Sequence, residues 1–344
     1  MKLDRLLHLL SHLGLAAAQY NFYPETANSY TNDLLPWLYN VSEAQRETAL
    51  STSYWTCSFL TASDNHQYML LGHTMWIAEI PMARASLLDL TDTSYYRMFL
   101  YSLDTAAQPA DINSQLIDAS IGDVGIEALS GDNVSRMRSF SNHSTLMYDL
   151  TYNATSQVLY NGGLGELTFG NDSCGEWAIP AARTEGILTV RGERLFVDPE
   201  RSFTWYDRQW GSGVGFKNYT WFQLHVPNTD IKASIWAIDY ESSTARIATF
   251  RFADGSHQVL PFELSSSSQN MYYSAATNAT YPTSWSLNFP GRGHIQVQSI
   301  RADQETYNTS SDAVAAYEGF STFKFNMFGY HADGFGITEI VNST

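Results

Sequence analysis

The chain has 344 residues, of which 44% are hydrophobic and 14% aromatic, and its formal net charge is -16 at pH 7. This length can bury a large core and suggests two domains of roughly 150 to 200 residues each. The acidic balance, with no basic patch to offset it, argues against nucleic acids and anionic membrane surfaces as partners. The 9 tryptophans and 21 tyrosines favour a wide apolar cavity with hydrogen-bonding side-chain tips, suited to a hydrophobic small molecule.

The amino terminus has the layout of a secretory signal peptide. Lys2 and Arg5 precede an apolar run from Leu6 to Leu15, and three alanines follow at positions 16 to 18. We predict a signal peptide over residues 1–18, so that the mature chain begins near Gln19. An amphipathic amino-terminal helix of a cytosolic protein is the alternative. The run is too short for a transmembrane segment, and no later stretch approaches the ~20 apolar residues that a span needs.

Glycosylation acceptor patterns support the secretory route. Nine of the 19 asparagines stand in N-x-S/T, where random placement would give about four. We predict a secreted or secretory-pathway glycoprotein. The acceptor positions are Asn40, Asn133, Asn142, Asn153, Asn171, Asn218, Asn278, Asn308 and Asn342.

Cys57 and Cys174 are far apart in the sequence and match neither a metal site nor a redox motif. In a secreted protein such a pair is typical of a disulfide, which we predict here. It would join the first strand region to the segment before the central hairpin. Two buried thiols are the alternative.

After this leader the chain is predicted to be nearly all β. The best local helix is Ser42–Leu50, where Ser42 and Gln45 form a capping pair, and a short helix or loop fits 111–119. Many short runs with alternating or β-rich composition, separated by turn signals such as those at 253–256 and 290–293, indicate a barrel or sandwich. These runs are 67–76, 95–103, 144–152, 176–179, 186–210, 220–226, 232–240, 245–253, 258–264, 284–289, 294–301 and 318–340.

Residues 186–211, GILTVRGERLFVDPERSFTWYDRQWG, combine a hairpin pattern with charges set among aromatics. Neighbours on a strand point to opposite faces, so Asp207 and Gln209 share one face while Arg208 and Trp210 share the other. One of these polar sets must face inward or into a cleft. A buried ion pair between domains and a direct role in a ligand site both remain open.

This stretch carries a family resemblance. The string WYDRQWG, after a G-x-L-x-x-x-G hairpin and before TWFQLHV, resembles the lipocalin-like family of hydroxyneurosporene synthases and AttH proteins. Residues 51–73 are similar to the amino-terminal part of the fungal Diels-Alderases of that family, and 317–340 to its closing strands. The resemblance implies a fungal source and two lipocalin-like β-barrel or sandwich domains packed side by side, with the ligand between them or in a barrel mouth.

The domain boundary is predicted in the glycine-rich stretch from Gly211 to Gly215. This divides the chain into an amino-terminal lipocalin-like domain over 19–213 and a carboxyl-terminal one over 214–344. The motif WYDRQWG would then lie at the domain interface, where ligand sites tend to form.

Motifs for a metal, a nucleotide or a covalent nucleophile were not found, so we expect no cofactor. The resemblance implies two enzyme classes that suit an aromatic pocket. Our main prediction is a Diels-Alderase-type pericyclase of secondary metabolism, acting on a polyene or quinone-methide-like substrate by positioning it. The alternative is a hydratase or dehydratase of the carotenoid hydratase and kievitone hydratase kind, which needs a neutral carboxylic acid and a base. A non-catalytic carrier of a hydrophobic metabolite is a third reading.

The candidate residues come mainly from the segments that carry the resemblance. For catalysis we select Asp207, Arg208 and Glu318. A core position is the alternative for Tyr54 and Trp55. A surface histidine is the alternative for His73, which could otherwise donate to a substrate carbonyl. Asp239 is a further available carboxyl. Glu339 is a suggested partner of Arg208. The predicted substrate-binding residues are Tyr54, Trp55, His73, Gln209, Trp210, Trp221, Gln223, His225, Lys324 and Glu339.

Overall fold

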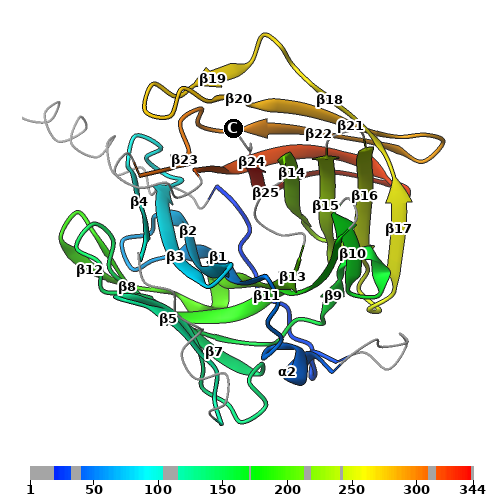
Figure 1. Ribbon diagram of the computed structural model, residues 1–344. Coiled ribbons are helices and arrows are strands. Elements are labelled where there is room, and N and C mark those ends of the chain that lie inside the picture. Colours follow the sequence, from blue (N-terminus) through cyan, green and yellow to red (C-terminus); the bar gives the residue numbers. More distant parts are fainter. Residues whose placement is uncertain are drawn as a thin grey trace, which may run out of the picture.

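The computed structural model describes residues 19–31, 40–103, 115–169, 172–212, 218–240, 243–308 and 315–341. Two strongly curved antiparallel sheets lie against each other and a two-stranded sheet flanks the second (Figure 1). The prediction of an all-β fold with two lipocalin-like domains packed side by side is confirmed. The predicted signal peptide and two acceptor asparagines, Asn171 and Asn342, lie outside the described residues.

The first sheet contains the strands of the amino-terminal domain in the order β4-β3-β2-β1-β13-β11-β8-β7-β6-β5, with β9, β10 and β12 paired to β11. Strands β5 and β6 also contact β2, so the sheet curls back on itself. Its strands are β1 (Ser51–Thr61), β2 (Gln67–Ile77), β3 (Ile80–Asp89), β4 (Tyr96–Ser102), β5 (Asp118–Ile121), β6 (Val124–Ala128), β7 (Arg136–Ser141), β8 (Tyr148–Asn153), β9 (Leu159–Tyr160), β10 (Glu166–Phe169), β11 (Asp172–Val190), β12 (Glu193–Phe196) and β13 (Phe203–Gly211).

The second sheet has the order β17-β16-β15-β14-β25-β24-β22-β21-β18, with β23 paired to β24. The first sheet ends and the second begins on either side of residues 213–217, which lie outside the described ranges, so the boundary stays a prediction. The strands of the second sheet are β14 (Asn218–Val226), β15 (Ile231–Tyr240), β16 (Ser243–Arg251), β17 (His257–Pro261), β18 (Glu263–Ser266), β21 (Ser284–Phe289), β22 (Gly293–Ser299), β23 (Glu305–Thr306), β24 (Ala316–Met327) and β25 (Tyr330–Val341). The small two-stranded sheet pairs β19 (Met271–Tyr273) with β20 (Thr280–Pro282).

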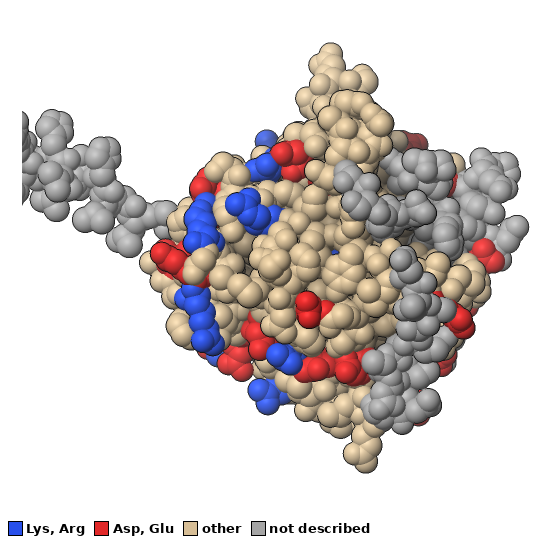
Figure 2. Space-filling view, turned by 60° about the vertical axis from the view of Figure 1, so that its left-hand side comes forward, with Lys and Arg blue, Asp and Glu red and all other residues tan. Residues whose placement is uncertain are grey.

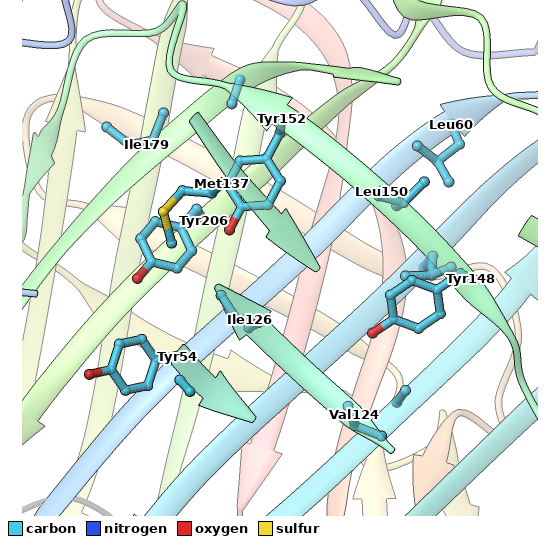
Figure 3. Close-up of a cluster of buried hydrophobic side chains, with 14 of the residues drawn as sticks. Tyr54, Leu60, Val124, Ile126, Met137, Tyr148, Leu150, Tyr152, Ile179 and Tyr206 are labelled. Atoms are coloured by element: carbon cyan, nitrogen blue, oxygen red, sulfur yellow. The ribbon is translucent and has the colours of Figure 1, made fainter. Parts of the chain in front are cut away.

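Strand β1 contributes to both the interior of the first barrel and the interface between the two domains. All of its residues are buried, because one face lines the interior of the first barrel and the other packs on the second sheet. Tyr54 belongs to the interior cluster, together with Tyr152 of β8 and Tyr206 of β13 (Figure 3). Its neighbour Trp55 belongs to the cluster between the sheets. Alternation along β1 and β13 therefore decides which side chains reach the interface.

Aromatic residues from both sheets and from the amino-terminal segment fill the interface. Phe59 of β1 packs against Phe335 of β25, with ring centroids 5.3 Å apart. Phe22, which is 1% exposed, lies 5.5 Å from Phe59 and 5.1 Å from Phe335. Such ring pairs stabilise a dry layer beyond the area that they bury. The two domains therefore present a packed floor and roof to any cavity that opens between them.

The predicted disulfide between Cys57 and Cys174 is wrong. Both are buried free thiols, and the strand register shows why they cannot meet. Cys57 stands opposite Trp205 on β13, whereas Cys174 stands opposite Gly211. Six residues along a strand separate them by about 20 Å, far beyond the ~7 Å limit for a disulfide.

Thiol titration tests this correction directly. In denaturant without reductant, two thiols per chain are expected to react, and the thermal midpoint of the folded protein should not change with reductant. In the folded state neither thiol should react at neutral pH, because burial raises the pKa of both Cys57 and Cys174 well above the ordinary value. A count of zero thiols in denaturant would restore the disulfide.

The predicted helix over Ser42–Leu50 is much shorter. Helix α2 covers only Val41–Ala44, and its amino terminus is capped by the Asn40 side chain rather than by Ser42. The short helices η1 (Asn161–Gly163) and η2 (Pro199–Arg201) follow later in the chain. Of the second predicted helix, 111–114 lie outside the described ranges and Asp118 begins β5.

One acceptor asparagine is used by the fold itself. Asn133 is 3% exposed, and its Oδ1 accepts a hydrogen bond from the Ile117 amide at 2.8 Å. A glycan on its side-chain nitrogen has no room, so Asn133 is withdrawn from the predicted sites. Of the other described acceptors, Asn40, Asn142, Asn218 and Asn278 are exposed and Asn153 and Asn308 are half-buried, and their glycans stay predictions.

Charge is spread over the surface rather than gathered. On the face shown in Figure 2, acidic and basic side chains are interspersed and separated by wide uncharged areas. This distribution suits the reading that the acidic excess keeps the protein in solution rather than attracting one partner. Within the part of the chain that the structure describes, no helix is long and apolar enough to cross a membrane.

Candidate active site

A grid of side chains on the first sheet forms the floor of a cavity between the domains. Strand pairing places Arg84, His73, Trp55 and Asp207 side by side in one row across β3, β2, β1 and β13. The next row, two residues along each strand, holds Met82, Met75, Ser53, Gln209 and Glu176. Residues two apart on a strand share a face, so both rows point toward the second sheet.

A matching row on the second sheet forms the roof. Strand pairing places Trp236, Trp221, Glu339 and Glu318 side by side across β15, β14, β25 and β24. Tyr219 and Val341 follow two residues along. The cavity between floor and roof is lined by Ser53, Trp55, His73, Met75, Ile77, Met82, Arg84, Glu176, Asp207, Gln209, Tyr219, Trp221, Trp236, Glu339 and Val341.

Arg84 ties the floor to two carboxylates of the roof. Its Nη2 lies 2.8 Å from Glu318 Oε1 and 2.6 Å from Glu339 Oε1. Trp55 Nε1 donates a further hydrogen bond to Glu318 Oε1 at 3.1 Å. All of these groups are buried, so the contacts are strong and hold one domain to the other.

Two further carboxyls, Asp207 and Glu176, lie on the floor away from Arg84. The Trp205 indole donates to Asp207 Oδ2 at 3.3 Å, and Gln209 Nε2 donates to Glu176 Oε2 at 3.3 Å. Asp207 Oδ1 is buried and has no hydrogen-bond partner among the described residues. This oxygen is therefore available to a ligand.

The cavity holds more carboxyls than its cation can neutralise. Among the residues that the structure describes, Arg84 is the one cationic side chain that lines it, against four carboxyls in and beside it. Burial raises the pKa of Asp207 to about 7, and the Glu339 charge adds to that rise. Burial likewise raises the pKa of Glu318 to about 7, although Arg84 opposes it. Burial and the neighbouring Asp207 raise the pKa of Glu176 well above the ordinary value.

These directions have one physical cause. A carboxylate moved out of water without a dedicated cation is costly, so the group takes up a proton instead. Asp207 and Glu176 influence each other, so their protons belong to the pair rather than to either residue. The site thus keeps at least one neutral carboxylic acid at neutral pH, which is what proton donation to a substrate requires.

His73 is a neutral imidazole on the floor. Burial and the adjacent Arg84 hold the pKa of His73 well below its ordinary value. Its Nε2 lies 2.8 Å from Ser53 Oγ, and its Nδ1 is buried without a hydrogen-bond partner in the described part of the chain. A neutral imidazole of this kind has a free position for hydrogen bonding or proton transfer.

Tryptophans enclose the polar groups. The rings of Trp55 and Trp221 meet edge to face with centroids 5.2 Å apart, and Trp221 stacks on Trp236 at 5.6 Å. Ser234 Oγ accepts a hydrogen bond from Trp221 Nε1 at 2.8 Å, which fixes the ring. Indole faces attract positive charge, so this wall favours an electron-poor centre in a bound molecule.

The cavity is narrow and has one apolar end. Its volume is about 50 Å³, which is room for only a few water molecules. Met75, Met82 and Val341 line the end that lies further along the strands. A substrate larger than water must displace side chains, and methionines adapt to that more readily than branched residues.

Six of the predicted site residues meet in this cavity: Trp55, His73, Asp207, Gln209, Trp221 and Glu339. Glu318 contacts them through Arg84 and Trp55. The suggested pairing of Glu339 with Arg208 is wrong, because Arg84 is the partner.

Arg208 faces the opposite side of β13, and its predicted catalytic role is corrected. Its guanidinium lies 4.2 Å from the centre of the Tyr54 ring. It donates hydrogen bonds to the backbone carbonyls of Gln45, Glu47, Ser53 and Gln209. Arg208 therefore holds α2 and the chain after it onto the barrel. Tyr54 donates to Gln45 O at 2.8 Å on this same face, and Trp210 also lies there, 5.3 Å from the guanidinium.

Three other predicted binding residues lie outside the cavity lining. Gln223 and His225 are buried deeper between the sheets, where Gln223 Nε2 lies 2.7 Å from His225 Nε2 and Phe203 packs 4.8 Å from the imidazole. Lys324 is exposed on the part of the second sheet beyond the first domain. There it borders a separate open trough of about 800 Å³ beside Tyr20.

Sequence reasoning missed Arg84, Ser53, Glu176 and Tyr219. Arg84 was not selected because its strand, IPMARASLLD, has a proline at its second position and an alanine on either side of Arg84, all weak strand signals. Glu176 stood at the edge of a predicted strand. That it lies near Asp207 follows only from the pairing register of the two strands, which the sequence does not give. Within the described residues, no group of three or more His, Cys, Asp or Glu is arranged to hold a metal ion.

Comparison with known proteins agrees with the geometry. Kievitone hydratase from Fusarium solani subsp. phaseoli is 38% identical over 329 residues, covering 94% of this chain and 92% of that protein. Dehydratase asqC from Emericella nidulans is 35% identical over 336 residues, covering 95% of each. These two relatives support an enzymatic function.

Solved structures give the same picture. The crystal structure of kievitone hydratase from Nectria haematococca has a TM-score of 0.87 at 38% identity, covering 95% of this chain and 99% of that one. The structure of CghA, at 10% identity and a TM-score of 0.60 over 95% and 98% of the chains, shows a likeness of fold alone. The AttH-like family model matches residues 35–342. The resemblance expected from WYDRQWG is thus confirmed, and the chain belongs to the AttH-like family.

Proposed function

We propose that this protein is a hydro-lyase, which adds water to or removes it from a hydrophobic small molecule bound between the two domains. The observation that carries the proposal is Asp207, a carboxyl buried in the cavity with a pKa of about 7 and one oxygen free for a ligand. Alkene hydration and alcohol dehydration both need an acid that is neutral at working pH. The hydratase and dehydratase relatives, at 38% and 35% identity, support the same chemistry.

Asp207 would act as the general acid. In dehydration, the reverse reaction, its carboxylate takes the proton from the carbon next to the one that loses the hydroxyl, the carbon–oxygen bond breaks, and water departs with the electron pair. In hydration it protonates the alkene carbon, and water attacks the adjacent electron-poor carbon. The indole faces of Trp221 and Trp236 stabilise positive charge as it develops.

Glu318 and Glu339 would serve a different purpose. Held by Arg84, they fix the roof over the floor. Glu318 Oε2 is buried without a partner in the described residues, so it can accept a hydrogen bond from a substrate hydroxyl. We therefore assign Glu318 to substrate orientation and Asp207 to proton transfer.

The proposal can be tested with kievitone, the compound in the name of the hydratase relative. Incubation in water enriched in oxygen-18 is expected to give a product heavier by one water and containing one solvent oxygen. A product isomeric with the substrate, without solvent oxygen, would contradict hydration and favour the pericyclase predicted from the sequence. Tight binding with the compound recovered unchanged would favour the carrier.

We also propose that the protein acts in the secretory route or outside the cell. The signal-like residues 1–18 and the excess of acceptor asparagines support this. Close to the predicted cleavage site, Tyr20 exchanges backbone hydrogen bonds with the Gln67 side chain at 2.8 and 2.7 Å. Amino-terminal sequencing of secreted protein that shows an intact Met1 would contradict cleavage.

A further inference from the structure

The hydro-lyase reaction needs a second proton carrier, and the cavity contains an unassigned pair that fits it. His73 lies in the floor row between Arg84 and Trp55 and is 5% exposed. Its Nε2 lies 2.8 Å from Ser53 Oγ, which belongs to the next row. Its Nδ1 is buried and has no partner in the residues that the structure describes. Both residues line the cavity.

We propose that His73 Nδ1 is the base that handles water in this site, and that Ser53 fixes the tautomer that leaves Nδ1 unprotonated. This inference rests on the proposed hydro-lyase function. In hydration, Nδ1 takes a proton from the attacking water. In dehydration the same groups work in reverse: His73, protonated at Nδ1, gives its proton to the leaving hydroxyl, and the Asp207 carboxylate takes the proton from the adjacent carbon.

The surroundings of His73 favour this role. Arg84 on β3 is its cationic neighbour, and Asp207 on β13, Glu176 on β11, and Glu339 and Tyr219 on the second sheet are the titratable groups that face the same cavity. The carboxyls are pushed toward their protonated forms, whereas the imidazole is pushed toward its neutral form. Acid and base therefore keep opposite states at one pH, which is the arrangement that paired proton transfer needs.

The Ser53 hydroxyl can accept as well as donate, and His73 Nδ1 has no acceptor among the described residues, so the tautomer with the hydrogen on Nε2 avoids a buried N–H without a partner. When Nε2 carries the hydrogen and donates to Ser53 Oγ, Nδ1 keeps an unpaired lone pair in a residue that lines the cavity. The hydroxyl of Ser53 then directs its own hydrogen elsewhere, and the ring cannot rotate without losing the bond. Ser53 is thus a positioning residue for His73.

The protons balance over one turnover. During hydration Asp207 gives one proton to the alkene carbon and His73 removes one from water, so a carbon–hydrogen and a carbon–oxygen bond form as the alkene bond is lost. The imidazolium left behind returns its proton to the Asp207 carboxylate through solvent or bound water. No oxidant, reductant or cofactor enters the step.

A His73→Gln substitution separates the base from the structural contact. A glutamine amide can replace Nε2 in the bond to Ser53, but it offers no basic nitrogen at the Nδ1 position. On kievitone we expect kcat to fall by about 10² to 10⁴-fold, the usual contribution of a general base, with a thermal midpoint close to that of the parent. Retention of kcat within about threefold, with wild-type hydration intact, would overturn the role of His73 and leave the hydro-lyase function standing.

His225→Gln is the matched control. His225 is 3% exposed, its Nε2 is bonded to Gln223, and its Nδ1 is also unpartnered within the described residues. It differs from His73 in lying outside the cavity lining. We expect kcat to change by less than threefold in this variant, and a loss equal to that of His73→Gln would contradict a specific base.

Nitrogen NMR of histidine-labelled protein tests the tautomer without any substrate. The His73 signals are expected to show an unprotonated Nδ1 and a protonated Nε2 in the wild type. In Ser53→Ala the two tautomers should mix, and the lower limb of the pH–rate profile should move. A wild-type His73 protonated at Nδ1 would overturn the inference, even if kievitone proves not to be a substrate.

Discussion

Replacing Asp207 by asparagine is expected to abolish turnover and to make the protein more stable above pH 7. The amide keeps the size of the side chain and can still accept the Trp205 hydrogen bond, but it cannot donate an acidic proton. Loss of a general acid lowers kcat by about 10² to 10⁴-fold. In the wild type, kcat/KM should fall as pH rises past about 7, since the Asp207 acid is then ionised.

The expected gain in stability follows from the sign of the pKa shift. Asp207 has a folded-state pKa of about 7 against an ordinary value of 3.8, so between these pH values the folded state binds more protons than the unfolded state. The free energy of unfolding therefore falls as pH rises through that window, and the full destabilisation by Asp207 is reached above about pH 7. A pKa raised from 3.8 to about 7 destabilises the folded state by at most about 4 kcal/mol, and the asparagine variant avoids part of this loss.

Asp239→Asn is the control for this substitution. Asp239 lies on β15 with its side chain 52% exposed, and its Oδ1 is 2.7 Å from Arg246 Nη2. Exposed pairs are worth about 0 to 1 kcal/mol, so this variant should keep its activity and lose little stability at any pH. Urea unfolding at pH 5 and pH 8, with kievitone hydration measured in parallel, checks both variants. An active Asp207→Asn would remove the general acid from the proposed mechanism.

The motif around Asp207 shows how much of the site could be predicted from the alternation of side chains along a strand. It correctly set Asp207 and Gln209 on one face and Arg208 and Trp210 on the other, because side-chain direction on a strand is a local property. It could not decide which face meets the second domain. Arg208 looked catalytic from the sequence since charged residues between aromatics suit a site, whereas its partners are backbone carbonyls near α2.

The pairing register of the strands could not be predicted from the sequence. Arg84 and Glu339 are 255 positions apart, and no local pattern indicates that β3 and β25 meet across the interface. The same lack of register made the disulfide between Cys57 and Cys174 plausible. The helix predicted from Ser42 ends early because the guanidinium of Arg208 and the hydroxyl of Tyr54 bond the carbonyl of Gln45, a tertiary contact that overrides local propensity.

Replacing Arg84 by methionine is expected to cause the largest loss of stability. The substitution leaves Glu318 and Glu339 buried without their cation, and breaking a buried ion pair from one side costs about 3 to 5 kcal/mol. The pKa values of both carboxyls are already raised by burial against the pull of Arg84, so its removal raises them further. The variant then binds more protons when folded than when unfolded, and its deficit should be large at pH 8 and small at pH 5.

Two further variants separate charge from packing in this test. Arg246→Met removes an arginine from the partly exposed pair with Asp239 and should cost at most about 1 kcal/mol at either pH. Adding Glu318→Gln and Glu339→Gln to Arg84→Met removes the uncompensated carboxyls and should restore most of the stability lost at pH 8. Urea midpoints measured at both pH values report the result. An equal loss at pH 5 and pH 8 would show that Arg84 acts through packing between the domains rather than through its charge.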